Sequence, residues 1–259
     1  MYDPAAPVVA DYAELDLSAA RRVFAFGDLH GRLDLLLDRL AEVAFDASAG
    51  DLLFSLGDFI DRGPDTFAIH DWLIANRRSI HWVRGNHEDL LHNALHEVGR
   101  TNAIDHLRNG GMWAVDAIRN GDSGRLTAFS DLLNSAPVAV RMRTPGGRDV
   151  GFVHADVPTA TWNDMKDALT SADDRVREDM VWNSQWTRTR FDAVRRLQKQ
   201  GALTADYDCS VAGIDHVFFG HSVTSAAFMQ SNCSWLDTGA HKTDNLTLID
   251  VDAWLSDAG

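Results

Sequence analysis

Residues 22–31 read RVFAFGDLHG: a short apolar run ends at a glycine, and the polar side chains of Asp28 and His30 follow at once. The pattern returns at 51–63, DLLFSLGDFIDRG, and again at 81–88, HWVRGNHE. Short apolar runs that end at glycine are typical of buried strands. The sequence therefore predicts three strands, each followed by a turn that carries polar residues.

Helical patterns lie between and after these strands. Leucines recur at helical spacing from Leu33 to Val43, a second amphipathic segment covers 66–76, and a further helix is expected from about 89 to 98. Strands joined by helix-length crossovers run parallel in one sheet, and the carboxyl ends of parallel strands line one crevice where ligands bind. We therefore expect the three polar turns to meet at one edge of the sheet.

The rest of the chain adds helices and a second group of strands. It is predicted to be helical over 101–134, with breaks at the glycines of 110–111 and 121, and near 163–200. Further strands are expected at 138–142, 150–153, 216–219, 226–229, 234–236 and 246–251. The first 20 residues read as an N-terminal arm, and no linker or repeat divides the chain. We expect one domain over 1–259, of the α/β (α+β) class, with two mixed sheets and helices outside them.

The composition excludes several classes of protein. Of the 259 residues, 45% are hydrophobic, which is enough for a sizeable core. The apolar runs are too short for a membrane span, and the N-terminus lacks the positive flank of a secretory signal. A formal charge of −14 disfavours nucleic acid and anionic membranes as partners. Only two cysteines are present, so a disulfide framework is not expected, and the chain is predicted to be cytoplasmic.

Two further histidines follow predicted strands, at the ends of 150–153 and 216–219, and they extend the polar set at the sheet edge. The candidate metal ligands are Asp28, His30, Asp58, Asn86, His154 and His221. Mixed nitrogen and oxygen ligands suit Mn, Fe or Zn better than Ca. Six ligands exceed the three or four of a mononuclear zinc site, so two metal ions sharing one carboxylate are the simplest count.

Each piece of this pattern also has a plain structural explanation. A single Gly-Asp step is usually a turn, and a lone histidine at a strand end is usually a hydrogen-bonded polar residue. Five such steps, all at predicted strand ends, favour a functional site. His92 and His96 have the spacing of two helical metal ligands, but no third ligand is evident, so a solvated helix face is the interpretation there.

These motifs together resemble the calcineurin-like metallophosphoesterases, in their phosphoprotein phosphatase branch. The similarity is greatest to the bacteriophage lambda-type serine/threonine protein phosphatases of bacteria, and it covers about residues 22–251. Besides GDLHG, GDFIDRG and RGNHE, it rests on 154–156 (HAD), 181–183 (VWN), 219–221 (FGH), 237–240 (DTGA) and 245–249 (NLTLI). The resemblance implies a four-layer fold, a β-sandwich of two mixed sheets flanked by helices.

The resemblance also implies a metal-binding role for six matching residues. Two divalent ions, Mn²⁺ first with Fe or Zn as alternatives, would be held by Asp28 and His30 at one site, by Asp58 as the bridge, and by Asn86, His154 and His221 at the other. A hydroxide that bridges the two ions would attack the phosphorus, as in other dinuclear phosphatases.

Catalysis is assigned by the same resemblance. His87 matches the general acid, and Asp61 matches the carboxylate that orients it. Arg62 and Asn86 match residues that bind the phosphoryl oxygens.

One position departs from the family pattern. A second phosphate-binding arginine is expected just after Trp182-Asn183, where this chain has Ser184-Gln185-Trp186. Arg188 is predicted to replace it, with Arg190 as one alternative and weaker phosphate binding by Arg62 alone as the other.

The predicted activity is therefore hydrolysis of phosphoserine and phosphothreonine in proteins or peptides, with phosphotyrosine or small phosphoesters as further substrates. The alternative is symmetrical bis(5′-nucleosyl)-tetraphosphate hydrolysis, whose enzymes typically carry alanine at the position of Asp61 and GNHD in place of GNHE. An alternative of another class is a metal-binding scaffold that has lost catalysis.

Overall fold

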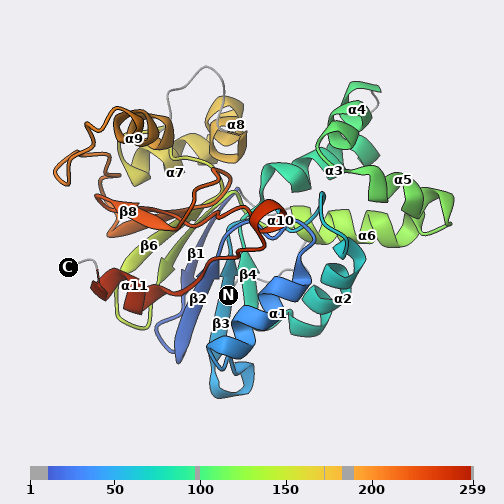
Figure 1. The fold of residues 1–259 in the computed structure, drawn as a ribbon, viewed down its shortest axis with the longest axis horizontal. Coiled ribbons are helices and arrows are strands. Elements are labelled where there is room, and N and C mark those ends of the chain that lie inside the picture. Colours follow the sequence, from blue (N-terminus) through green and yellow to red (C-terminus); the bar gives the residue numbers. More distant parts are fainter. Residues whose placement is uncertain (1–10, 97–99, 172, 183–189, 258–259) are drawn as a thin grey trace.

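The computed structural model describes residues 11–96, 100–171, 173–182 and 190–257, and shows two sheets with helices around them (Figure 1). The strands are β1 (Tyr12–Asp16), β2 (Arg22–Phe26), β3 (Asp51–Ser55), β4 (Ile80–Trp82), β5 (Ala139–Arg143), β6 (Asp149–Val153), β7 (His216–Phe219), β8 (Phe228–Gln230), β9 (Cys233–Trp235) and β10 (Leu248–Asp250). The helices are α1 (Leu33–Glu42), α2 (Thr66–Asn76), α3 (Asn86–His96), α4 (Arg100–Arg108), α5 (Met112–Arg119), α6 (Ser123–Asn134), α7 (Trp162–Thr170), α8 (Asp174–Trp182), α9 (Arg190–Lys199), α10 (Ala240–Thr243) and α11 (Val251–Asp257). The predicted mixed α/β class is confirmed.

The four-stranded sheet contains the three strands that the opening motifs predicted. Its order is β10-β2-β3-β4, and β2, β3 and β4 are parallel, with Phe24 opposite Leu53 and Leu53 opposite Ile80. Strand β10 closes the sheet in the antiparallel direction beside β2. Helices α1 and α2 form the two crossovers, so the carboxyl ends of β2, β3 and β4 lie at one edge.

The six-stranded sheet has the order β1-β5-β6-β7-β9-β8, and it corrects one prediction. Residues 1–20 were expected to form an arm, but Tyr12–Asp16 is a strand that pairs in parallel with β5. The Tyr12 ring packs beside Trp162, and the indole Nε1–H of Trp162 donates to its hydroxyl at 3.2 Å. This edge strand depends on partners more than 120 positions away along the chain, which no local pattern reveals.

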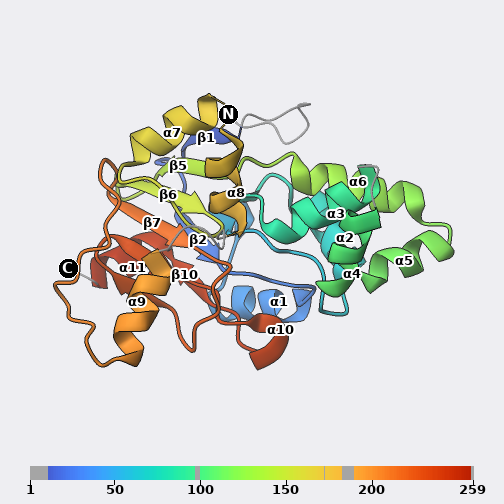
Figure 2. The same ribbon diagram turned by 90° about the horizontal axis from the view of Figure 1, so that it is seen from above.

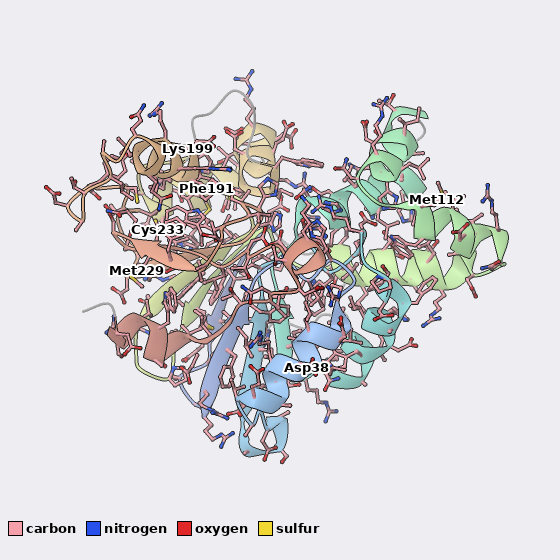
Figure 3. The ribbon with its side chains drawn as sticks, viewed as in Figure 1. Asp38, Met112, Phe191, Lys199, Met229 and Cys233 are labelled. Atoms are coloured by element: carbon pink, nitrogen blue, oxygen red, sulfur yellow. The ribbon has the colours of Figure 1, made fainter. Side chains whose placement is uncertain are left out.

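Aromatic side chains fill the space between the two sheets. The rings of Phe54 on β3 and Phe152 on β6 stack with centroids 3.9 Å apart, and Phe218 on β7 stacks on Phe152 at 5.3 Å. The outer face of the four-stranded sheet packs on α1, α2 and α6, and that of the six-stranded sheet packs on α7, α8 and α9. Phe191 of α9 and Cys233 of β9 belong to the core between the six-stranded sheet and these helices (Figure 3). The predicted four-layer sandwich is confirmed.

Helices α3 to α6 lie together at one side of the sheets (Figures 1 and 2). Helix α3 starts directly at the polar turn after β4, and it packs against both α4 and α6. The group therefore extends outward from the edge that carries the predicted site. In the part of the chain described, no helix is both long and apolar enough to cross a membrane.

Candidate active site

Five loops bring polar side chains to one edge of the sandwich. Asp28 follows β2, Asp58 follows β3, and Asn86 starts α3 after β4, all in the four-stranded sheet. His154 follows β6 and His221 follows β7, both in the six-stranded sheet. Because both sheets end here, residues far apart in sequence become neighbours.

Asp58 lies at the centre of this group. Its Oδ2 atom is 3.6 Å from Nε2 of His30 and 3.9 Å from Nε2 of His87, and its Oδ1 atom is 3.5 Å from Nε2 of His154. Ligand-type atoms come within 4.8 Å of one another in two sets, one of His30, Asp58 and His87 and one of Asp58, His154 and His221. The carboxylate of Asp58 is common to both sets, as a bridging ligand would be.

Two further side chains connect the sets. Oδ1 of Asn86 lies 2.9 Å from Nε2 of His154 and 2.9 Å from Nδ1 of His221. Asp28 accepts the backbone N–H of His221 at 2.9 Å through Oδ1, and its Oδ2 is 3.8 Å from Nε2 of His30. All six residues predicted as metal ligands are therefore gathered in one place.

The histidines of the site present lone pairs toward its centre. His30 donates its Nδ1–H to the carbonyl of Ile60 at 2.9 Å, and His154 donates its Nδ1–H to the carbonyl of Leu56 at 2.6 Å. These bonds fix the tautomer in which the Nε2 lone pair of each ring faces the site, where it could coordinate a metal ion. Burial lowers the pKa of His30 and of His221 to about 3, so both rings are neutral near pH 7, the form that binds metal ions.

The buried carboxylates indicate that this edge needs a cation. Burial, together with the charges of Asp237 and Asp58, raises the pKa of Asp28 well above its usual value. Burial likewise raises the pKa of Asp237 to about 6. Neutral imidazoles beside crowded, buried carboxylates and an amide oxygen form a donor set that suits divalent transition metals. The residues present thus fit a metal centre.

His87 and Asp61 form a buried pair next to the metal ligands. Nδ1–H of His87 donates to Oδ2 of Asp61 at 2.7 Å, and both side chains are fully buried. Burial opposes the charged form of His87, but the charges of Asp58 and Asp61 and the hydrogen bond to Asp61 outweigh it and raise its pKa. Such a pair can hold a proton and direct it.

Arg62 lies beside the metal-ligand group. Its side chain is exposed, yet one Nη atom is 2.6 Å from Nε2 of His30 and the other is 2.8 Å from Nε2 of His87. The planar guanidinium therefore lies beside the metal-ligand residues and His87, where it can donate two hydrogen bonds to a phosphoryl group.

Comparison with known proteins identifies the family to which this geometry belongs. The sequence model of the calcineurin-like phosphoesterases matches residues 21–225. The chain belongs to this family. Its members use divalent metals, in agreement with the donor set described above, and the assignment makes the chain a hydrolase of phosphoesters.

Comparison with individual proteins extends the similarity beyond the matched family segment. Serine/threonine-protein phosphatase 1 of Salmonella typhimurium is 30% identical over 242 residues, which is 92% of this chain and 95% of the relative. A symmetrical bis(5′-nucleosyl)-tetraphosphatase of Pseudomonas fluorescens is 33% identical over 149 residues, 58% of this chain and 47% of that protein. A solved protein serine/threonine phosphatase of Saccharomyces cerevisiae shares the fold, with a TM-score of 0.59, 16% identity, and coverage of 91% of this chain and 73% of its own.

The two candidates for a second phosphate-binding arginine have different outcomes. Arg188 lies outside the described residues of this phosphoesterase. Arg190 lies on α9, and its Nε and Nη2 donate to the carbonyls of Cys209 and Thr159 at 3.1 and 2.6 Å. Its Nη1 donates to the carbonyl of Val157. The guanidinium of Arg190 therefore holds loops together in this structure, and a phosphate-binding role for Arg190 stays an untested alternative.

Sequence reasoning missed a residue that joins two loops of the site. The carboxylate of Glu88 is fully buried and accepts the backbone N–H groups of Asp58 and Gly85 at 2.8 Å and of Phe59 at 2.9 Å. A methyl group on Gly85 would lie 2.3 Å from Oδ1 of Asp58, so only glycine fits there. A glutamate directly after a predicted site histidine was the one available signal for this role.

Glu88→Ala is expected to lower the free energy of unfolding by about 3 kcal/mol, because three buried N–H groups lose their acceptor at once. Urea denaturation of the metal-free protein measures the change. Glu42→Ala is the matched control, since Glu42 is exposed and pairs with Arg39 on the same helix, and it is expected to change stability by less than about 0.5 kcal/mol. Equal effects of the two substitutions would show that Glu88 does not fasten the loops.

The backbone of the site is strained, as it often is at functional positions. Five non-glycine residues of the site have positive φ angles: His30, Asp58, Asp61, Arg62 and His221. Side chains disfavour this left-handed region. The packed loops therefore impose the conformation that points these side chains inward.

Histidines away from the site were expected to be structural or solvated. His92 and His96 on α3 are half-buried and exposed, respectively, and Nε2 of His96 pairs with Asp131 of α6 at 3.4 Å. The structure thus places a third ligand-type group, the carboxylate of Asp131, beside the two histidines. The spacing of the histidines in the sequence did not reveal this group.

Proposed function

We propose that this phosphoesterase hydrolyses phosphomonoesters, with phosphoserine and phosphothreonine in proteins or peptides as its substrates, and that it uses two divalent ions, Mn²⁺ in preference to Fe or Zn. One observation carries the proposal: Asp58 is shared by two sets of ligand atoms, and the His87–Asp61 pair and Arg62 lie directly beside it. A substrate phosphate placed between them would meet a metal centre, an acid and an arginine.

Different residues of the chain bind the phosphate and transfer the proton. Arg62 binds and orients the phosphoryl oxygens, and Asn86 is close enough to the same centre to assist. His87, kept charged by Asp61, gives its Nε2 proton to the departing alkoxide oxygen. Divalent ions, when bound, would neutralise the phosphoryl charge and lower the pKa of water.

Two features favour a protein phosphatase over a dinucleoside tetraphosphatase. In the sequence comparison, the two serine/threonine phosphatases of Salmonella typhimurium match 92–93% of this chain, whereas two symmetrical bis(5′-nucleosyl)-tetraphosphatases match 52–58% of it. Asp61 is also fully buried against His87, so the residue that tetraphosphatases typically replace by alanine is integrated into this site. Both features support monoester hydrolysis.

The proposal is tested by turnover after addition of Mn²⁺, with phosphoserine and phosphothreonine peptides compared with diadenosine tetraphosphate at equal concentration. Faster hydrolysis of the peptides, measured as released phosphate, than of diadenosine tetraphosphate, measured as ADP formed, is the expected result. Preferential cleavage of diadenosine tetraphosphate would replace the proposal by its alternative. Absence of turnover on both, and on a generic aryl phosphate, would support a silent metal-binding scaffold.

Arg62→Ala is expected to raise KM and to lower kcat/KM by roughly 10- to 150-fold, since one charge-assisted contact to phosphate contributes about 1.5–3 kcal/mol. Steady-state kinetics on a phosphopeptide measure the change. Arg119→Ala is the control, because the Arg119 side chain is 70% exposed on α5 and pairs with Asp116 of the same helix. Kinetics of Arg62→Ala that match those of the control would remove Arg62 from phosphate binding.

A further inference from the structure

The carboxylate of Asp61 is held from two sides. Its Oδ2 atom accepts Nδ1–H of His87 at 2.7 Å. Its Oδ1 atom accepts Nε2–H of His106 at 2.9 Å and the indole Nε1–H of Trp113 at 2.6 Å. Asp61 is fully buried and His106 is 3% exposed. One oxygen therefore faces the proposed acid, and the other faces helices α4 and α5, which we call the cap helices.

The turn between the cap helices is shaped to fit this contact. A methyl group on Gly111 would lie within 2.4–2.5 Å of the His106 ring. Gly110 has a φ of +108°, and a methyl group there would lie 2.8 Å from the backbone nitrogen of Arg62. Larger residues at either position would push the turn away from His106 or from Arg62.

The cap helices present different side chains inward and outward. Trp113 turns its indole toward Asp61, whereas Met112, one residue earlier, is 56% exposed on the outer side of the helix group (Figure 3). The inward contact is therefore specific to His106 and Trp113, and it is made to one oxygen atom of one carboxylate.

We propose that His106 is a positioning residue: with Trp113 it fixes the carboxylate of Asp61 so that Oδ2 holds the ring of His87 toward the leaving-group oxygen. The proposal rests on the proposed function, in which His87 is the proton donor. The backbone of Asp61 has a φ of 70° and cannot by itself fix the rotation of the carboxylate. Two N–H groups on one oxygen supply that constraint.

The nature of the leaving group separates this role from a merely structural one. An alkyl or phenyl oxygen needs a proton to depart, whereas p-nitrophenolate departs without one. A misplaced His87 therefore slows hydrolysis of phenyl phosphate and spares p-nitrophenyl phosphate. A general loss of folded or metal-loaded protein would slow both to the same extent.

The test compares His106→Leu, which removes the N–H donor, with His106→Gln, whose amide nitrogen can restore it. With the metal-loaded enzyme, His106→Leu is expected to lower kcat on phenyl phosphate about 10-fold and kcat on p-nitrophenyl phosphate less than about 2-fold, with KM unchanged. His106→Gln is expected to recover most of this loss. Arg119→Leu, at an exposed residue of cap helix α5, is the control and should stay within about 2-fold of wild type on both substrates.

Equal losses on both substrates, no loss on either, or failure of His106→Gln to recover activity would overturn the positioning role. A wild type that hydrolyses neither phosphate ester would instead count against the proposed function. For that case, the NMR signal of the His87 Nδ1 proton gives a readout without turnover. It is expected to be protected from exchange in wild type and His106→Gln and lost in His106→Leu, and its persistence in His106→Leu would refute the proposal.

Discussion

His87→Asn is expected to lower kcat by about 10²–10⁴-fold on a phosphoserine peptide, because the alkoxide would then leave without a proton. Metal content should stay unchanged, since His87 is assigned to proton transfer. The structure makes this a demanding prediction, because Nε2 of His87 lies only 3.9 Å from Asp58 and shares a possible ligand set with His30. Kinetics and elemental analysis on the same preparation measure both quantities.

Asp61→Asn is the companion variant for His87. It should lower kcat in the same direction but by less, because Asp61 acts only through His87 and the asparagine can still accept a hydrogen bond at one atom. Loss of a metal ion in His87→Asn would place His87 among the ligands and contradict its assignment as the acid.

Asp58→Asn is expected to cause the second large effect. The carboxylate is shared by both sets of ligand atoms, so its neutralisation weakens two metal sites at once. Metal ions contribute several kcal/mol of charge stabilisation in phosphoryl transfer, which corresponds to a loss of kcat/KM of about 10³-fold or more. Equilibrium dialysis with Mn²⁺ and assays on one phosphopeptide measure the two losses together.

Asp38→Asn is the matched control for this substitution, because it removes the same charge from an exposed position on α1 (Figure 3). It is expected to keep wild-type metal binding and activity. An Asp58→Asn protein that still binds two ions and turns over normally would show that Asp58 is not the bridge.

The core of the fold could be predicted because its signals are local. Strands β2 and β3 are short apolar runs that lead to Gly27 and Gly57, and helix α1 between them follows leucine spacing. Parallel order then follows from the crossover lengths alone, and with it the edge where Asp28 and Asp58 meet. Residue type and position after a predicted strand were enough to identify the six candidate ligands in the sequence.

The missed features depend on tertiary contacts. Strand β1 carries polar and acidic residues, and only its pairing with β5 makes it a strand. His106 lies in a polar helix with no motif around it, yet the fold places its ring 2.9 Å from Asp61. The one local signal for this contact was the glycine pair at 110–111, which by itself indicates only a helix break. Its significance depends on the structure, where Gly111 lies against the His106 ring and Gly110 against Arg62.

The count of bound metal ions tests the central claim most directly. The wild-type chain, stripped by a chelator and reloaded with Mn²⁺, is analysed for metal and assayed on a phosphopeptide as the ion is titrated back. We expect activity to be absent after chelation, to return with the metal, and to reach its maximum at two ions per chain, as the two ligand sets that share Asp58 require. Full activity with one ion per chain, or after complete removal of metal, would contradict the dinuclear mechanism.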